Sequence, residues 1–424
     1  MKVLVIGSGG REHALVWKLS KSPRIKKIFA APGNGGIGEL AACVDIMPDN
    51  ITDLAEFASD KKIDLTIVGP EVPLVAGITG EFQRRGLSIF GPSQMASMLE
   101  GSKSFAKDFM RRFNIPTADY EVFDDGQKAI DYVKSRKPAF VIKADGLAAG
   151  KGVIVTNTRD DAVTAIKMIM FDKVFKSAGN RVVVEEYLEG EEATILAFTD
   201  GKTVIPMESS QDHKRLMDKD MGPNTGGMGA YSPAPVITDD LNRKILDEIL
   251  IPTVKGLDNI GRTYKGVLYA GLMITKKGPK VIEFNVRLGD PEAQVVIPRL
   301  QNDLVDIIEA VLSNDLNNVS LKWDERKAVC VVIASGGYPD KYETGFDIRG
   351  LDDINKIDNV LVFHAGTTGI DSRVVTTGGR VLAVTGLGIT FKEAIARAYL
   401  GVNKIKFEGM HYRKDIAWRA TARR

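Results

Sequence analysis

A short strand pattern near residue 283 carries polar side chains that could bind a metal ion and phosphate. Because strand side chains alternate between two faces, we expect Glu283, Asn285 and Arg287 to share one face. The apolar residues beside them are expected to be buried on the other face: Ile282, Phe284 and Val286. A carboxylate and an amide oxygen suit Mg²⁺, and an arginine beside them could contact phosphate. The alternative is a half-buried strand with a solvated polar face.

Two glycine-rich turns follow predicted strands and could hold phosphate with backbone N–H groups. Residues 7–12 do not form a full dinucleotide fingerprint, because Glu12 occupies the third glycine position. Residues 145–152 do not form a Walker A loop, because the spacing is short by one and no Ser or Thr follows Lys151. A tight turn that needs glycine is an equally good interpretation of each loop.

Three lysines could supply positive charge near a polyphosphate: Lys103, Lys143 and Lys151. The segment 185–192 follows an apolar strand, so its backbone could contact an adenine edge and a glutamate could accept ribose hydroxyls. Taken singly, each lysine could equally be a surface residue, and the acidic segment a solvated turn.

The elements that must position these residues begin with a strand–helix alternation over residues 1–100. It predicts a parallel sheet covered on both faces, with ligands at the carboxyl ends of the strands. The expected strands are 3–6, 28–30 and 65–68, and the expected helices are 13–21, 52–61 and 72–85. The glycine clusters follow these strands.

After Gly101 the pattern changes to a small α+β lid and then to a larger sheet. A helix is expected over 102–113 with Ser102 as N-cap, and the lid strands at 139–143, 152–156 and 181–186. The expected strands of the larger sheet are 194–198, 204–207, 266–274 and 280–287. We expect the long polar stretch 211–232 to lack regular structure and to be functional. A last unit begins near Lys327, and Thr390 is expected to cap its helix.

Composition excludes several other classes of protein. The formal charge is +2, from 57 Lys and Arg against 55 Asp and Glu, so no broad nucleic-acid or membrane-binding face is expected. Two distant cysteines, Cys43 and Cys330, and four histidines argue against disulfide scaffolds and structural zinc. No apolar run approaches the length of a membrane span. We expect a cytoplasmic protein without a membrane or nucleic-acid partner.

The order of loop, acidic connector and metal strand resembles the ATP-grasp superfamily. Longer segments resemble, within it, the glycinamide ribonucleotide synthetase family, from the first strand almost to the last residue. These segments are GSGGREHAL, GPEVPLVAGI, GPS, EGSKSFAKDFM, IKADGLAAGKGV, QDHKR, GPNTGGMGAYSPAP, VIEFNVRLGDPE, VFHAG and GMHYRKDI.

The resemblance implies a multidomain protein of α/β and α+β class. It has an N-terminal Rossmann-like parallel sheet (1–100), an ATP-grasp lid and core (101–326, with the lid at about 118–190) and a small C-terminal α/β domain (327–424). The implied reaction joins glycine to 5-phosphoribosylamine in purine biosynthesis, through glycyl phosphate, and converts ATP to ADP and phosphate. The implied cofactors are ATP and Mg²⁺, with Mn²⁺ as a substitute ion. The implied partners are these small molecules only, and the expected state is a monomer or a weak oligomer.

The resemblance also implies roles for individual residues. The metal ligands are Glu283 and Asn285, and the catalytic residues are Arg287, Asp290 and Asp212. The nucleotide-binding residues are Lys103, Lys143, Gly146, Gly150, Lys151, Gly152, Glu185, Leu188 (through its backbone) and Glu192, with Glu191 as an alternative to Glu192. The substrate-binding residues are Gly9, Gly10, Glu71, Asn224, Thr225 and Arg380. Asp212, Asn224 and Thr225 are placed for glycine, and Arg380 for the 5′-phosphate.

The sequence departs from the superfamily at one point that matters. The strand 267–274 lacks the additional metal carboxylate that many members carry, so water and phosphate are expected to complete the ion's shell. Three other functions are weighed: a carboxyphosphate-forming ATP-grasp ligase, a non-catalytic nucleotide-binding regulator and a nicotinamide dehydrogenase. The QDHKR segment and residues 222–230 favour the glycine enzyme over the first of these, and Arg287 and Asp290 beside the metal pair favour an enzyme over the second.

Overall fold

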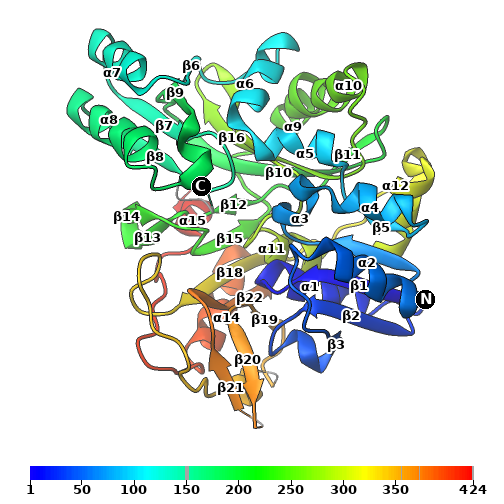
Figure 1. Ribbon diagram of the computed structural model, residues 1–424. Helices are drawn as coiled ribbons and strands as arrows, with labels where there is room; N and C mark the ends of the chain where they lie inside the picture. Colours follow the sequence, from blue (N-terminus) through cyan, green and yellow to red (C-terminus); the bar gives the residue numbers. More distant parts are fainter. Residues whose placement is uncertain (149–151, 355, 372, 423–424) are drawn as a thin grey trace.

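The computed structural model describes residues 1–148, 152–354, 356–371 and 373–422. Its N-terminal part is a five-stranded parallel sheet in the order β3-β2-β1-β4-β5 (Figure 1). The strands are β1 (Lys2–Gly7), β2 (Lys27–Pro32), β3 (Ala42–Cys43), β4 (Leu65–Val68) and β5 (Ile89–Phe90). The helices are α1 (Gly10–Leu19), α2 (Ile51–Asp60), α3 (Glu71–Ala76), α4 (Ile78–Arg84) and α5 (Gln94–Gly101).

Both faces of this sheet are buried, as the strand–helix alternation predicts. Val3 and Val5 pack with α1 in one core cluster, and Leu4 and Ile6 pack with α2 and α4 in another. The helix predicted over 72–85 is wrong as a single element. It divides at Gly77, whose φ of +99° is in the left-handed region that ends a helix.

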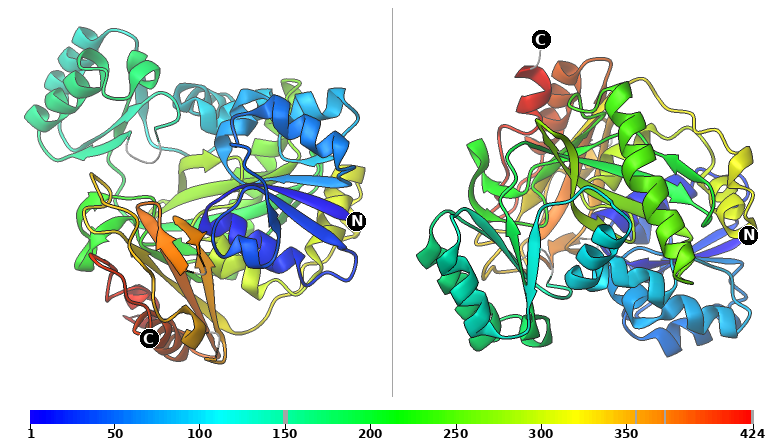
Figure 2. Two further views of the ribbon diagram at one scale, coloured as in Figure 1. Left: turned by 60° about the horizontal axis from the view of Figure 1, so that its bottom comes forward. Right: turned by 90° about the horizontal axis from the view of Figure 1, so that it is seen from above.

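The lid is a separate four-stranded antiparallel sheet, β6-β9-β7-β8, with two helices on one face. Figure 2 shows it extending away from the rest of the molecule. Its elements are β6 (Tyr120–Phe123), α7 (Gly126–Ser135), β7 (Phe140–Ala144), β8 (Val153–Thr156), α8 (Arg159–Ile166) and β9 (Val182–Glu186). Before it, α6 (Lys103–Arg112) begins where predicted, because the Ser102 Oγ accepts the Phe105 N–H at 3.1 Å.

The core sheet has the order β11-β10-β16-β17 and is antiparallel. Its strands are β10 (Glu191–Thr199), β11 (Val204–Pro206), β16 (Gly266–Thr275) and β17 (Gly278–Asn285). Apolar residues of α9 (Asp239–Ile245) and α10 (Ile251–Asn259) cover one face. The helices α11 (Ala293–Val296) and α12 (Leu304–Ser313) pack toward the N-terminal sheet in the other core cluster.

The expectation that residues 211–232 lack regular structure is wrong. They form β12 (Gln211–Asp212), β13 (Arg215–Met217), β14 (Met221–Asn224) and β15 (Gly229–Ser232). The strands β12 and β15 join β18 (Lys327–Ala334), β22 (Arg380–Gly388) and β19 (Val360–His364) in one sheet, which therefore contains strands from both sides of residue 327. Period-two patterning could not reveal these strands, because a strand of two to four residues is too short to show an alternation.

The C-terminal part adds a hairpin and three helices to that sheet. These are β20 (Thr367–Ile370), β21 (Arg373–Thr376), α13 (Leu351–Ile354), α14 (Phe391–Val402) and α15 (Trp418–Ala422). Thr390 caps α14 as predicted, since its Oγ1 accepts the Glu393 N–H at 3.2 Å. None of the helices in the described ranges is both long and apolar enough to cross a bilayer.

Candidate active site

The polar face of β17 forms the centre of the site. Glu283 pairs with Gly271 of β16, and Asn285 pairs with Tyr269, so both project on the same side. A bulge lies between these pairs and the pair of Val281 with Leu272. Ile282 is the extra residue at this bulge. The prediction that it is buried with Phe284 and Val286 is therefore wrong, because the bulge turns Val281 into the core instead.

Arg287 is held in place by carboxylates. Its guanidinium donates to Glu71 Oε2 at 3.2 Å, Glu100 Oε1 at 2.9 Å and Asn285 Oδ1 at 3.1 Å. Burial alone would lower its pKa, but the charges of Glu100 and Glu71 raise it. Burial raises the pKa of Glu100 to about 7 despite Arg287, and Glu71 adds to the rise. The guanidinium is thus a fixed positive charge beside the predicted metal pair.

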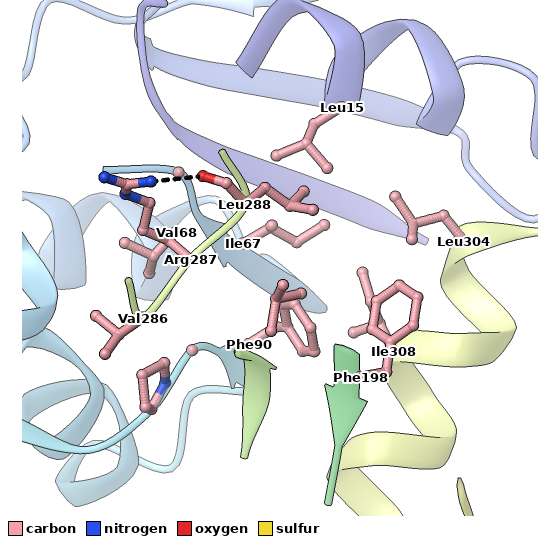
Figure 3. A pocket seen from close by; sticks show the side chains of 14 residues that line it. Leu15, Ile67, Val68, Phe90, Phe198, Val286, Arg287, Leu288, Leu304 and Ile308 are labelled. Atoms are coloured by element: carbon pink, nitrogen blue, oxygen red, sulfur yellow. Dashed lines mark hydrogen bonds between the residues drawn. The ribbon is translucent and has the colours of Figure 1, made fainter. Parts of the chain in front are cut away.

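A small apolar cavity lies behind this arginine, between the N-terminal sheet and the core (Figure 3). Its volume is about 20 Å³, and the walls include Ile67, Phe90, Phe198 and Ile308. Figure 3 shows the Arg287 guanidinium directed away from these side chains and bonded to the Leu288 carbonyl. A space of one water molecule cannot accept a nucleotide, so the candidate site is the polar face of β17.

Two predicted nucleotide lysines face this region from separate elements. Lys103, at the start of α6, donates to the Gly146 carbonyl at 2.7 Å, and burial lowers its pKa. Lys143, near the end of β7, donates to the Ile282 carbonyl at 3.0 Å and so joins the lid to β17. It also pairs with Glu185 at 2.8 Å.

Glu185 lies between two buried ammonium groups, and one of them was not predicted. Lys107 Nζ is 2.8 Å from the second oxygen of Glu185, and all three side chains are at most 4% exposed. Lys107 has the α-helical spacing i, i+4 from Lys103, a signal that sequence analysis could have used. The Glu185 carboxylate thus fixes Lys107 and Lys143. Its contact with adenosine is not tested by this geometry and stays a prediction.

The glycine loop between β7 and β8 is described only at its two ends. Gly146 has a φ of +144°, and a Cβ there would lie 2.9 Å from the Ala178 Cβ. At Gly152 a Cβ would lie 2.6 Å from the Ala148 Cβ. Gly150 and Lys151, also predicted to bind nucleotide, lie outside the described residues.

The two candidate ribose carboxylates are both engaged at the start of β10. The Gln211 side chain donates to Glu191 Oε1 at 3.1 Å, and Lys214 Nζ is 2.7 Å from Glu192 Oε2. The choice between Glu191 and Glu192 therefore stays open. Leu188, whose backbone was predicted to contact adenine, precedes them in the connector from β9.

Lys214 is a second cation that sequence analysis missed. Its Nζ lies 3.9 Å from Glu283 Oε1 as well as near Glu192. Burial would lower its pKa, but the carboxylates of Glu192, Asp212 and Glu283 raise it well above its usual value. Burial would likewise raise the pKa of Glu283, but Lys214, Lys143, Lys103 and Arg287 together lower it. The signal for Lys214 was its position two residues after Asp212, which gives both the same face of an extended segment.

Asp212 lies in an acidic part of the site. Burial raises its pKa to about 7, Lys214 opposes this rise, and the nearby carboxylates of Glu292, Glu192 and Glu283 add to it. Glu292, which was not predicted, is buried and accepts the Tyr269 hydroxyl at 2.8 Å. This part of the site has an excess of negative charge that suits a cationic ligand.

Asp290 joins the core to the N-terminal sheet. Gln294 Nε2 donates to its carboxylate at 2.8 Å, and Arg380 Nη2 lies 3.4 Å from it. Burial would raise the pKa of Asp290, but Arg380 and Arg11 lower it, so it is ionised. A Cβ on Gly9 would lie 3.1 Å from Asp290 Oδ2, and one on Gly10 would lie 2.4 Å from Gln294 Nε2. The structure thus brings Gly9, Gly10, Asp290 and Arg380 together.

The remaining predicted residues differ in how they are used. The Thr225 hydroxyl donates to the Lys214 carbonyl at 2.8 Å, so it holds the β13–β14 hairpin. Asn224 pairs with Arg215 across that hairpin. Arg380 donates to the carbonyls of Gly226 at 2.7 Å and Asp290 at 2.9 Å. Their contacts with glycine and the 5′-phosphate stay predictions.

The donor set fits Mg²⁺ bound together with phosphate. Glu283 offers a carboxylate, and the Asn285 Oδ1 has a second lone pair besides the one that accepts Arg287. Across the described residues, no group of three or more His, Cys, Asp or Glu could enclose a metal ion. Two hard oxygen ligands that leave positions for phosphate and water are typical of Mg²⁺ in nucleotide sites.

Comparison with known proteins assigns the whole chain to one family. Family models of phosphoribosylglycinamide synthetase match residues 1–100 (N domain), 101–293 (ATP-grasp domain) and 328–419 (C domain). The chain is 52% identical over 417 residues to a phosphoribosylamine–glycine ligase of Caldanaerobacter subterraneus, covering 98% of this chain and 99% of the relative. It is 51% identical over 428 residues to the ligase of Escherichia coli O157:H7, covering 100% and 99%.

Solved structures agree with this assignment. The crystal structure of phosphoribosylamine–glycine ligase from Thermotoga maritima superimposes with a TM-score of 0.85 at 33% identity, covering 98% of this chain and 100% of that one. A biotin carboxylase from Campylobacter jejuni has a TM-score of 0.74 at 14% identity, covering 97% and 92%, which shows a shared fold alone.

Proposed function

Since the chain belongs to the phosphoribosylglycinamide synthetase family and is an ATP-dependent ligase, we propose that it joins glycine to 5-phosphoribosylamine at the polar face of β17. The product is glycinamide ribonucleotide, a step of purine biosynthesis. The observation that carries this proposal is the placement of cationic side chains around the metal pair. Lys214 lies 3.9 Å from Glu283, Arg287 donates to Asn285, and Lys143 donates to the carbonyl of Ile282, next to Glu283.

The nucleotide is bound between the lid and the core. Lys103 and Lys143 hold its phosphates together with Gly146 and Gly152, and Leu188 with Glu191 or Glu192 holds the adenosine. Glu283 and Asn285 hold Mg²⁺, or Mn²⁺ in its place, which neutralises phosphate charge when bound. Arg287 stabilises the charge on the transferred phosphoryl group, because its fork is fixed by Glu71 and Glu100.

The reaction has two steps. A glycine carboxylate oxygen attacks the γ-phosphorus, the bond to ADP breaks, and glycyl phosphate forms. The phosphoribosylamine nitrogen then attacks the acyl carbon, phosphate leaves with that oxygen, and the nitrogen loses a proton. Positioning supplies most of the rate, so no nucleophilic side chain is needed.

Each substrate has a separate part of the site. Asp212 and Glu292 bind the glycine ammonium group, and their excess negative charge supports this role. Asp290 and Gln294 face the amine of phosphoribosylamine beside Gly9 and Gly10. The Gln294 Oε1 is buried and has no hydrogen-bond partner in the described part of the chain, so it can accept a hydrogen bond from the amine.

The function is tested with purified protein and a panel of carboxylate–amine pairs. ADP release should require glycine together with phosphoribosylamine, formed in place from ribose 5-phosphate and ammonia. Release with bicarbonate instead would indicate a carboxyphosphate-forming ligase. Tight ATP binding without turnover on any pair would indicate a regulator. We also propose that the enzyme works in the cytoplasm as a monomer or weak oligomer.

A further inference from the structure

The segment 211–217 presents different residues on its two sides. Lys214, which shares a face with Asp212, lies near Glu192 and Glu283 on the side of the site. His213, between Asp212 and Lys214, points the other way and is 1% exposed. The positions of Asp212 and Lys214 therefore depend on the contacts that hold His213 and the backbone on the opposite side.

That opposite side is held by residues 411–419, which we call the C-terminal brace. The Ala417 N–H donates to His213 Nε2 at 3.0 Å, Arg413 Nη1 donates to the Arg215 carbonyl at 3.1 Å, and the His411 Nε2 lies 3.1 Å from the Leu216 carbonyl. Figure 1 shows α15, at the end of the chain, beside β12 and β13. The brace thus contacts consecutive parts of one short segment.

The contacts centre on a buried arginine and one aspartate. Arg413 is fully buried and pairs with Asp220 at 3.0 Å and with Asp415 at 2.8 Å. Asp220 also pairs with Arg419 at 2.5 Å and lies 3.8 Å from His213 Nδ1. Two backbone bonds close the contact, from the Lys219 N–H to Asp415 at 2.8 Å and from the Lys414 N–H to Asp218 at 2.7 Å.

The turn before β14 is held in an unusual conformation by these bonds. Lys219 and Asp220 both have left-handed φ values, of 58° and 55°. Such a conformation in two successive non-glycine residues persists only when surrounding contacts impose it. A turn that needs a distant partner to keep its shape is suited to transmit that partner's position to the strand before it.

We propose that the C-terminal brace positions Asp212 and Lys214 for catalysis, with Arg413 and Asp220 as the positioning residues. Neither residue touches a predicted substrate position, and both act through the backbone of residues 213–216. The proposal rests on the function proposed above, because it uses glycine as the ligand of Asp212.

The test is the Asp220→Asn variant, which keeps the side-chain shape but removes the charge that Arg413 and Arg419 share. We expect the KM for glycine to rise about threefold to tenfold and kcat to fall, because a charge-assisted hydrogen bond is lost. The KM for phosphoribosylamine, which binds beside Asp290, should stay unchanged. Amide hydrogen exchange over 211–217 should be faster. Asp220→Glu, which keeps the charge, should restore most of the glycine KM.

The matched control is Asp347→Asn, which breaks an exposed ion pair with Arg373 in the same C-terminal part. It should leave every kinetic constant unchanged. A lower melting temperature of Asp220→Asn with a wild-type KM for glycine would overturn the proposal, and so would an equal rise in both KM values. Arg413→Lys serves as a second variant with the same criteria. If the wild-type chain itself fails to turn over glycine, the proposed function fails, and exchange at 211–217 still decides whether the brace supports that segment.

Discussion

Arg287 is fixed more firmly than an arginine that only binds ground-state phosphate needs to be. It contacts Glu71, Glu100, Asn285 and the Leu288 carbonyl, and its side chain is 16% exposed. In the proposed role, a guanidinium held in this way needs no rearrangement to stabilise the transferred phosphoryl group. Such preorganisation lowers the barrier of the chemical step rather than the dissociation constant of ATP.

The Arg287→Lys variant should therefore lose kcat. A lysine cannot contact Glu71, Glu100 and phosphate with one planar fork, so we expect kcat to fall by about 100-fold. The KM for ATP should change little. Steady-state kinetics with calorimetric binding of an ATP analogue measure both quantities, and thermal unfolding checks the fold. A change confined to the KM for ATP would make Arg287 a ground-state ligand.

Asp212 should give the reaction a pH dependence. Burial and neighbouring carboxylates raise its pKa to about 7, so below that pH it is largely neutral and holds an ammonium group poorly. We expect kcat/KM for glycine to rise with pH through about 7 and then level. The Asp212→Asn variant should have a lower kcat/KM and lack this step. ATP ionises in the same way in assays of the wild type and of the variant, so any difference between their pH profiles comes from Asp212. An identical pH profile in the variant would contradict the role of Asp212.

Asp290 should act on the second substrate. The Asp290→Asn variant retains an oxygen that accepts the Gln294 hydrogen bond, so the fold and ATP binding should persist. Without the negative charge we expect a higher KM for phosphoribosylamine, a lower kcat or both, with the KM for glycine unchanged. Loss of thermal stability with wild-type kinetics for phosphoribosylamine would assign Asp290 a structural role in its turn.

At the scale of elements, the contact between α1 and β19 contains a buried histidine pair. The His364 N–H donates to His13 Nδ1 at 2.8 Å, and the rings lie 5.5 Å apart. Burial lowers the pKa of His13 to about 3, with His364 contributing, and burial lowers that of His364 to about 4. Neither ring is charged in the folded protein at neutral pH.

This pair should make the folded protein less stable in acid. As pH falls below the ordinary value of 6.5, the unfolded chain binds protons that the folded protein cannot. The free energy of unfolding should then fall by at most about 1.4 kcal/mol per pH unit for each histidine, and level off near pH 4 to 3. His13→Asn, whose oxygen can replace Nδ1 as acceptor, should reduce the slope. Denaturant unfolding between pH 4 and 7.5 measures it, and an unchanged slope would refute the assignment.

Some elements could be predicted from the sequence because their signals are local. The buried strand β1, the Ser102 and Thr390 caps and the shared face of Glu283 and Asn285 each depend on residues a few positions apart. The bulge at Ile282 depends on the pairing of β17 with β16, which no local pattern encodes. For the same reason the strands of 211–232 were missed.

Site residues divide in the same way. Residues on recognisable motifs, such as Glu283 and Arg287, could be named as site residues from the sequence. Their chemical roles remain predictions. Glu100, Lys107, Lys214 and Glu292 were missed, because each matters through a partner brought near only by the fold: Arg287, Glu185, Glu283 and Tyr269 respectively. Their residue types alone are those of ordinary surface positions.

At the scale of the whole molecule, the N-terminal, ATP-grasp and C-terminal parts of the chain all supply residues to the candidate site. The N-terminal sheet contributes Gly9, Gly10 and Glu71, the lid contributes Lys143, and the core contributes β17. The C-terminal part places Arg380 beside Asp290, and its brace contacts Asp220 through Arg413. The division at residues 100 and 327 stays a prediction about sequence units, since one sheet contains strands from both sides of residue 327.

The central claim is that glycine is activated by transfer of a phosphoryl group to its carboxylate. It is tested most directly with glycine labelled with ¹⁸O in both carboxylate oxygens, turned over with unlabelled ATP and phosphoribosylamine. The attacking oxygen stays on phosphorus when the amine displaces it, so each phosphate released should carry a single ¹⁸O, detected by ³¹P NMR or mass spectrometry. Phosphate without label, alongside normal product formation, would contradict the account.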